Sequence, residues 1–477
     1  MRGTEPLSTI TELFFTRTLN ASDWDAICRR SPFVRRYHTL DSCFSPVMRT
    51  LLDNIPPPDV LFPNLREVTL DLSMLQTTNL QSGVIAAIAA PTLTHWTIEH
   101  LCFVMHPKEL DISPFTRCDQ LRNLESVGDS VYKFQNLDTY TSPYANFFDD
   151  LRACRDLTTI HLNLGVYEYL RRAHLDDIGG RDFGFNTLVA LGHKQVTFSA
   201  SRFPCLQHLT LKSFPPAFVR AIFAANPLLS LETLWLDADI DDCEWYHAFL
   251  SAVHQGCDPM TLREFGLDTR QVCWDEEFPV QSSPEDVFNL HALVSISTFA
   301  RLTIVDLERL ALAKLTDADC AVIAGWWPEL VYLSLGTAES APLCTGSALV
   351  SFRQSCPHLE YLKLAFRTDE ESINEALVAF EGIAMPSPPL RFTLHANDSP
   401  INPEVVRPLA AFLLRVFPTL QRLDCGDFSS DMAIVWDEDE ISVEESRRAD
   451  GWEERDALWA EVADVVFATV HGAPSTQ

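Results

Sequence analysis

The hydrophobic positions of this chain repeat one phrase, in which an apolar residue and a proline lead into the pattern Leu-x-x-Leu-x-Leu. Between Trp327 and Leu335 the phrase reads Trp-Pro-Glu-Leu-Val-Tyr-Leu-Ser-Leu. Further copies begin at Phe62, Ala90, Phe203, Cys356 and Phe417, and weaker copies without the proline start at Leu121, Leu157, Leu231, Leu262, Leu302 or Leu307, and Leu390. The last two leucines follow the two-residue period of a strand, so they face one side and the residues between them face the other.

The first leucines of most consecutive copies recur at a nearly constant interval, although it lengthens to 36 residues from Leu121 to Leu157 and to 49 from Leu157 to Leu206. The interval is 28 residues from Leu65 to Leu93, 29 from Leu330 to Leu359 and 31 from Leu359 to Leu390. Leucine-rich repeats of about 20–29 residues contain one strand and one helix or helical turn. The pattern therefore predicts an α/β leucine-rich-repeat solenoid, an open horseshoe or arc with parallel strands on the concave side and helices on the convex side.

Specific residues follow from this prediction. The strand core is expected to contain Leu65, Leu93, Leu206, Leu234, Leu333, Leu362 and Leu423. One-sided apolar stripes at helical spacing predict helices over residues 216–225, 244–254, 317–327 and 404–417, and Thr316 is expected to cap the third. The three cysteines that stand in the apolar position before a repeat leucine are expected to be small buried hydrophobes: Cys118, Cys154 and Cys356.

The repeats divide the chain into three parts. Residues 1–60 are predicted to form a helical N-terminal cap with a degenerate first repeat, in which Ser22 caps the first helix. Residues 61–428 form the repeats, about 11–13 units. An insertion on a loop edge is expected at 165–202, and it or residues 274–285 could instead contain a further degenerate repeat. Residues 429–477 are predicted to form an acidic, helical C-terminal cap that seals the array.

Composition narrows the function. The formal net charge is −30, which would repel nucleic acid and anionic membranes, so we expect neither as a partner. No apolar run approaches the roughly 20 residues of a membrane helix, and no secretory signal is apparent. The 13 cysteines are scattered, without a Cys-x-x-Cys pair, which indicates a reducing cytoplasmic or nuclear compartment.

Sequence motifs for chemistry are absent. There is no phosphate-binding loop, no His-Glu-x-x-His and no Gly-x-Ser-x-Gly, so we expect no enzyme and no cofactor, although a catalytic site of unfamiliar type remains an alternative. His95, His161 and His208 occupy comparable strand positions and could in principle hold a metal. They come from non-adjacent repeats and lack a fourth ligand, so we expect no metal.

The better lead is the strand face that points away from the core. Trp, Tyr and Arg dominate binding hot spots, and several such side chains fall at outward strand positions. We therefore expect a target protein to bind on the concave face through Trp235, Arg309, Tyr332, Tyr361, Lys363 and Arg422.

The chain resembles fungal (basidiomycete-type) F-box and leucine-rich-repeat proteins in three consecutive segments, 307–312, 315–324 and 327–330. The helix around Trp24, the segment Val34-Arg35-Arg36 and the copy at Phe62 look like the region that follows an F-box. The resemblance implies the substrate-recognition part of an F-box-type ubiquitin ligase receptor. The alternative is a stand-alone scaffold or inhibitor without a ubiquitin role. Residues 1–20 contain no Leu-Pro pair that would open an F-box. We therefore expect the ligase adaptor to bind only if an F-box is supplied.

Overall fold

In the computed structural model the chain forms two compact units, residues 1–230 and 231–477. The residues that the structure describes are 20–38, 60–71, 78–99, 113–127, 151, 153–163, 203–212, 216–226, 228–237, 243–268, 290–307, 315–336, 342–381, 383, 385–396, 399–424 and 452–471. Arg309, the insertion predicted at 165–202, the segment 274–285 and the acidic stretch 429–451 lie outside the described residues.

The first unit contains strands that pair in chain order. Its described elements are α1 (Ala21–Arg30), η1 (Ser31–Phe33), β1 (Arg36–His38), β2 (Glu67–Asp71), α3 (Thr78–Ile88), β3 (His95–Glu99), η3 (Ser113–Arg117), β4 (Asn123–Val127), β5 (Thr159–Asn163), β6 (His208–Lys212) and α7 (Pro216–Ala225). Each strand from β1 to β6 pairs with the next one in parallel.

The second unit repeats this arrangement. Its described elements are β7 (Thr233–Asp237), α8 (Cys243–Gly256), β8 (Glu264–Asp268), α9 (Leu290–Leu293), η5 (Val294–Ile296), β9 (Ile304–Leu307), α10 (Asp317–Trp326), β10 (Tyr332–Leu335), α11 (Gly346–Ser355), β11 (Tyr361–Lys363), α12 (Glu370–Glu381), β12 (Phe392–His395), η6 (Pro403–Val405), α13 (Val406–Val416), β13 (Leu420–Asp424) and α15 (Trp452–His471). Strands β7 to β13 also pair in parallel and in chain order.

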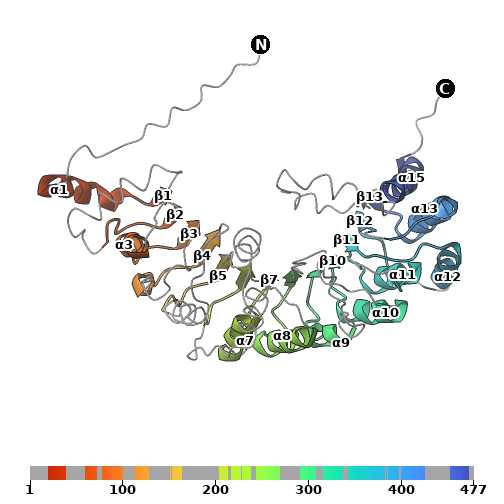
Figure 1. The fold of residues 1–477 in the computed structure, drawn as a ribbon, viewed down its shortest axis with the longest axis horizontal. Coiled ribbons are helices and arrows are strands. Elements are labelled where there is room, and N and C mark those ends of the chain that lie inside the picture. The colour runs from red at the N-terminus through yellow and green to blue at the C-terminus, as the bar shows by residue number, and fades with distance from the viewer. Residues whose placement is uncertain are drawn as a thin grey trace, which may run out of the picture. The chain divides into compact units, whose positions relative to one another are not determined.

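The predicted α/β leucine-rich-repeat solenoid is confirmed within each unit. In the second unit each pair of consecutive strands is separated by a helix or helical turn, and α10, α11, α12 and α13 lie along one side of β10 to β13 (Figure 1). In the described part of the first unit, α3 lies between β2 and β3, and η3 between β3 and β4. The seven leucines predicted for the strand core are all buried. Leu333 and Leu362 are register partners on β10 and β11, and Leu362 pairs in turn with Leu394 on β12. The core is therefore the layer between the strands and the helices.

A tight turn explains the apolar-Pro-x-Leu phrase. In the copy at Trp327, the N–H of Leu330 donates to the carbonyl of Trp327 at 3.1 Å, and in the copy at Phe417 the N–H of Leu420 donates to Phe417 at 3.0 Å. A hydrogen bond from residue i+3 to residue i defines a β-turn, and proline favours its second position because its φ is already set. Each turn thus places a leucine inward immediately before the strand begins.

Of the two N-cap residues predicted from the sequence, one is confirmed and one is wrong. Thr316 caps α10 as predicted: its Oγ1 accepts the N–H of Asp319 at 3.2 Å, and the carboxylate of Asp319 accepts the N–H of Thr316 at 2.9 Å. The prediction of Ser22 as the cap of α1 is wrong. Asn20 is the cap, because a start two residues earlier puts Asp23 at the third helical position, where it completes a reciprocal capping box.

Helix α15 covers the last described helix of the repeats. It contacts α13 and buries Trp459, Val462 and Val466. The indole N–H of Trp459 donates to the carbonyl of Ser399 at 3.1 Å, and its ring lies edge-on to Phe366 with centroids 6.1 Å apart.

Among the described helices, none combines the length and apolar character needed to span a bilayer.

Replacing Leu333 with alanine should lower the free energy of unfolding by about 2–5 kcal/mol, because Leu333 is fully buried and its truncation leaves a cavity. Urea denaturation followed by circular dichroism measures this change. Val378→Ala is the matched control, since Val378 is 72% exposed on α12 and its truncation should cost less than about 0.5 kcal/mol. A Leu333→Ala variant as stable as this control would show that Leu333 does not belong to the core.

Candidate functional site

The candidate site is the outer sheet face of the second unit, defined as the side of strands β7 to β13 opposite their inward leucines. Strand register arranges its side chains in two rows. The tyrosine row contains Thr233, Glu264, Ile304, Tyr332, Tyr361, Thr393 and Arg422. The tryptophan row contains Trp235, Gly266, Asp306, Ser334, Lys363, His395 and Asp424.

The centre of the tyrosine row is aromatic. Tyr332 on β10 and Tyr361 on β11 are register partners, and their rings stack with centroids 4.3 Å apart and planes inclined by 6°. Ile304 on β9 is the register partner of Tyr332 on the other side. All three side chains are half-buried, so each leaves part of its surface accessible. Three adjacent strands thus present one continuous apolar strip.

Trp235 lies apart from this strip. Its ring occupies the space beside Gly266, where an added Cβ would come within 2.0 Å of the indole carbon Cε3. A glycine on β8 therefore lets the indole lie across the neighbouring strand. Since Trp235 is on β7 and Tyr332 on β10, three strand spacings separate them, or roughly 14 Å. The structure does not bring Trp235 into contact with the tyrosines, although both belong to the same face.

The middle of the tryptophan row is polar and buried. Ser334, Lys363 and His395 are at most 3% exposed, although they point away from the leucine core. Lys363 was predicted to contact a partner, but at this burial it offers little surface for one. Strand alternation determines which face a side chain occupies, whereas its depth depends on the neighbours that surround it.

Arg422 ends the tyrosine row and remains exposed. Its guanidinium Nε lies 2.8 Å from the carboxylate of Asp424, and the side chains are 60% and 17% exposed. An ion pair this open contributes little stability. It nevertheless limits the directions in which the guanidinium can point.

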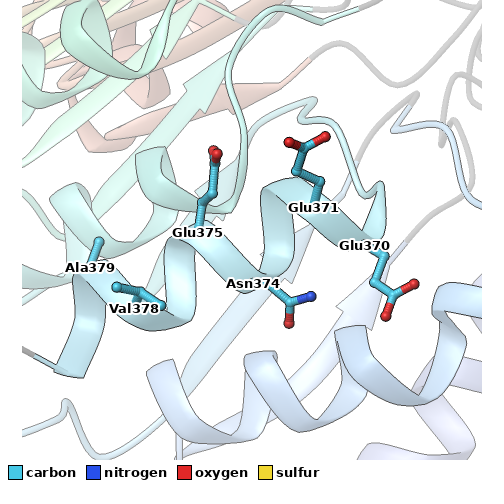
Figure 2. Close-up of a pocket in the computed structure, with 6 residues that line it drawn as sticks. All are labelled: Glu370, Glu371, Asn374, Glu375, Val378 and Ala379. Atoms are coloured by element: carbon cyan, nitrogen blue, oxygen red, sulfur yellow. The ribbon is translucent and has the colours of Figure 1, made fainter.

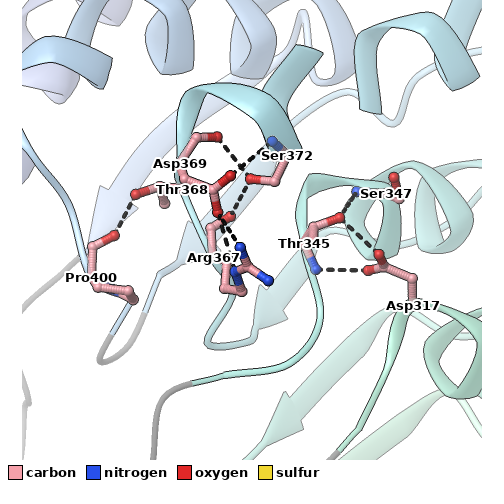
Figure 3. Close-up of polar contacts among 8 residues, drawn as sticks. All are labelled: Asp317, Thr345, Ser347, Arg367, Thr368, Asp369, Ser372 and Pro400. Carbon is pink, nitrogen blue, oxygen red and sulfur yellow. Dashed lines mark hydrogen bonds and ion pairs between the residues drawn. The ribbon is translucent and has the colours of Figure 1, made fainter. Parts of the chain in front are cut away.

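Hydrogen bonds between repeats hold the helices behind this face. The carboxylate of Asp317 accepts the N–H of Thr345 at 2.7 Å and its hydroxyl at 2.8 Å, which joins the start of α10 to the start of α11 (Figure 3). Within the repeat of α12, Asp369 accepts the N–H of Ser372 at 2.9 Å at the start of the helix, and this bond together with Arg367 keeps the pKa of Asp369 below its usual range. The hydroxyl of Thr368 donates to the carbonyl of Pro400. Neighbouring repeats are thereby locked at the edge where the helices begin.

A shallow depression on α12 lacks the features of a ligand-binding pocket. Its lining residues are Glu370, Glu371, Asn374, Glu375, Val378 and Ala379, all of which come from this single helix (Figure 2). A surface supplied by one helix offers no enclosed space and no convergent polar groups. It is an acidic helix surface.

The histidines of the first unit are dispersed over its strands. His95 and His208 occupy corresponding positions on β3 and β6, whereas His161 on β5 is one row further along. Nδ1 of His161 lies 3.6 Å from the carboxylate of Glu125. In the part of the chain that the structure describes, no group of three His, Cys, Asp or Glu side chains converges as metal ligands would.

His161 should remain neutral in the folded protein at pH 7. Burial lowers its pKa and the charge of Lys212 lowers it further, whereas Glu125 partly offsets both effects. Because the unfolded pKa is about 6.5, the contribution of this group to stability should be present above pH 6.5 and lost as the pH falls through the folded pKa.

Titration of the His161 ring by NMR checks this directly, and a pKa at or above 6.5 would contradict it. In parallel, the loss of stability between pH 7.5 and pH 5.5 should be larger for the wild-type protein than for His161→Asn, whose side chain does not titrate.

Comparison with known proteins yields structural likeness alone. A scan against protein-family models finds no match, and neither does a search of curated proteins. Among solved structures, the chain is similar to an internalin from Listeria monocytogenes (12% identity, 77% of this chain and 82% of that chain covered, TM-score 0.35). It is also similar to a chain of the Rad7 and Elc1 complex in yeast (14% identity, 76% and 77% covered, TM-score 0.36). A third is the leucine-rich repeat-containing protein LegL7 from Legionella pneumophila (14% identity, 81% and 89% covered, TM-score 0.32). Since these scores are low, the fold assignment rests on the strand pairing and burial of this chain itself.

Proposed function

We propose that this chain is a protein-binding leucine-rich-repeat module whose second unit holds a target protein on its outer sheet face. The observation that supports this is the apolar strip of Ile304, Tyr332 and Tyr361 on three adjacent strands. Its side chains are half-buried and lie on the face opposite the core leucines, so the core does not use this part of their surface. A partly exposed strip on a rigid sheet is a suitable base for a protein contact.

The tyrosine stack suits binding on energetic grounds. A tyrosine supplies a large contact area and has only two side-chain torsions to immobilise. Stacking of Tyr332 on Tyr361 already restricts those torsions before any partner arrives. The entropy lost on binding is correspondingly smaller, which raises affinity without additional contacts.

Charged side chains on either side of the apolar strip supply orientation. Glu264 lies on β8, one strand beyond Ile304, and its carboxylate accepts the hydroxyl of Thr233 at 3.3 Å. Arg422 lies on β13 with Asp424 beside it. Opposite charges at two ends of an apolar strip favour one direction of docking over the reverse.

The chemistry of the cysteines also favours binding over catalysis. The thiolate is the nucleophilic form of cysteine. Burial raises the pKa of the Cys356 thiol to about 12 and that of Cys257 further still. These thiols are therefore protonated at neutral pH, and both are buried with the apolar core.

A narrower form of the proposal makes the chain the substrate-recognition part of an F-box-type ubiquitin ligase receptor. The sequence resemblance around residues 307–330 supports this form. A stand-alone scaffold or inhibitor is the alternative, and the two differ in whether the ligase adaptor binds. The described part of residues 1–60 offers little surface for it, because Trp24 on α1 is already buried and Ile27 and Cys28 are half-buried.

Truncating the stack should weaken target binding. Proteins captured from a lysate by the wild-type chain and lost with Tyr332→Ala/Tyr361→Ala are the candidates to purify. Titration with each should show an affinity at least about tenfold lower for the double variant, since hot-spot truncations cost about 1 kcal/mol or more each. Val378→Ala, on the helix side, is the control and should bind as the wild type does. Affinities within twofold for a correctly folded double variant would exclude the tyrosine row as the binding site.

This chain should not bind the ligase adaptor, because the short helix α1 cannot bury Trp24 in its own unit and against a second protein at once. Purified chain and adaptor, mixed at micromolar concentration, should elute separately in size-exclusion chromatography. A chimera with an F-box fused to the N-terminus is the positive control. Co-elution of the chain alone with the adaptor would contradict the prediction and favour the receptor over the stand-alone scaffold.

A further inference from the structure

The negative charge of this protein is confined almost entirely to one unit. Residues 231–477 contain 15 Lys and Arg against 43 Asp and Glu, a formal charge of −28. Residues 1–230 contain 21 Lys and Arg against 23 Asp and Glu, a formal charge of −2. The first unit is thus nearly neutral, so a local group of basic residues in it is not offset by a large excess of negative charge in the same unit.

One such group lies at the edge where the strands of the first unit begin. The residue immediately before each strand hydrogen-bonds to its counterpart in the preceding repeat: Arg66 N–H donates to Arg35 at 2.8 Å, Thr94 to Arg66 at 2.8 Å, and Arg122 to Thr94 at 2.9 Å. Two further members of this edge, Thr158 and Gln207, continue the same pattern. The backbone therefore aligns Arg35, Arg66 and Arg122 along one edge, which we name the arginine row.

The arginine row is exposed to solvent. All three arginines are exposed, and none forms an ion pair among the residues that the structure describes. Nη1 of Arg35 donates to the carbonyl of Asn64 at 3.1 Å. The carboxylate of Glu67, which follows Arg66 in the chain, is engaged by Arg36 at 2.8 Å.

Acidic residues on the neighbouring turns have basic neighbours of their own. Asp119 lies two residues from Arg117, and Asp156 follows Arg155 directly. These pairs sum to no net charge. The positive charge of the edge therefore comes from the arginine row.

We propose that the arginine row binds an acidic segment of a partner protein in extended conformation. Parallel strands lie about 4.8 Å apart, so Arg35 on the edge before β1 and Arg122 before β4 are roughly 14 Å apart. Same-side residues of an extended peptide recur about every 6.8 Å, so three alternate acidic residues span the same distance. Arginine matches this ligand because its planar guanidinium binds a carboxylate through two parallel hydrogen bonds.

An acidic protein segment fits better than a nucleic acid. Polynucleotide binding depends on many phosphate contacts and extends over a long charged surface. Three arginines cover only a short ligand, and the unit that follows them in the chain carries a charge of −28. This surface is separate from the tyrosine row, so its test does not depend on the function proposed above.

Fluorescence anisotropy of the full chain with a labelled peptide tests the proposal. In the probe, glutamate alternates with serine over about nine residues, enough to cover the row. An otherwise identical peptide with glutamine in place of glutamate is the neutral control. The acidic peptide should bind, the neutral one should not, and binding should weaken as salt is raised.

The decisive comparison is between two double variants with the same change of charge. Arg66→Gln/Arg122→Gln should lower the affinity for the acidic peptide by at least about threefold. Arg29→Gln/Arg220→Gln removes two exposed arginines from helices α1 and α7 of the same unit and should leave it unchanged.

Three results would overturn the proposal: no binding of the acidic peptide by the wild-type chain, equal loss in the two double variants, or tighter binding of a single-stranded oligonucleotide than of the peptide. The last would assign the row to nucleic acid. Circular dichroism melts of both variants confirm that a loss of binding is not a loss of fold.

Discussion

One turn in each repeat determines which side chains of the following strand face the core. In this turn the carbonyl of the apolar residue before the proline accepts the N–H of the first leucine. Trp327 with Leu330 and Phe417 with Leu420 show this hydrogen bond. Since strand side chains alternate, a slip of one residue would turn every inward leucine outward. The buried anchor and leucine oppose such a slip at the entry to the strand. Because strand side chains alternate from this leucine onward, the turn also determines which residues lie on the outer sheet face.

Parallel strand register places equivalent outward side chains of consecutive repeats next to one another. Neighbouring strands lie about 4.8 Å apart, close to the separation at which flat rings stack. Tyrosines at equivalent positions of consecutive repeats therefore meet face to face, as Tyr332 and Tyr361 do at 4.3 Å. Hydrogen bonds at the helix starts, such as that between Asp317 and Thr345, keep adjacent repeats from shifting. The apolar strip thus results from repetition itself, with one side chain contributed by each repeat.

The two units use the same scaffold with different chemistry. The second unit combines an aromatic strip with a charge of −28, and the first is nearly neutral with arginines along one edge. A repeat architecture permits this because outward positions contribute little to the core and can vary independently. Distinct surfaces on one chain would allow two contacts with one partner or contacts with two partners. The separate variants of the two rows distinguish these cases.

The sequence by itself determined the fold of this protein, because the leucine phrase and its spacing report local rules that hold in every repeat. Burial of Leu65, Leu333 and Leu362, the cap at Thr316 and the outward direction of the tyrosines all follow from these rules. The tertiary structure decided what depends on neighbours distant in sequence. It buried Lys363 between Ser334 and His395 and laid Trp235 beside Gly266. It also brought Arg35, Arg66 and Arg122, each of which follows the first apolar residue of its repeat, to one edge, because strand register aligns equivalent positions of repeats about 30 residues apart.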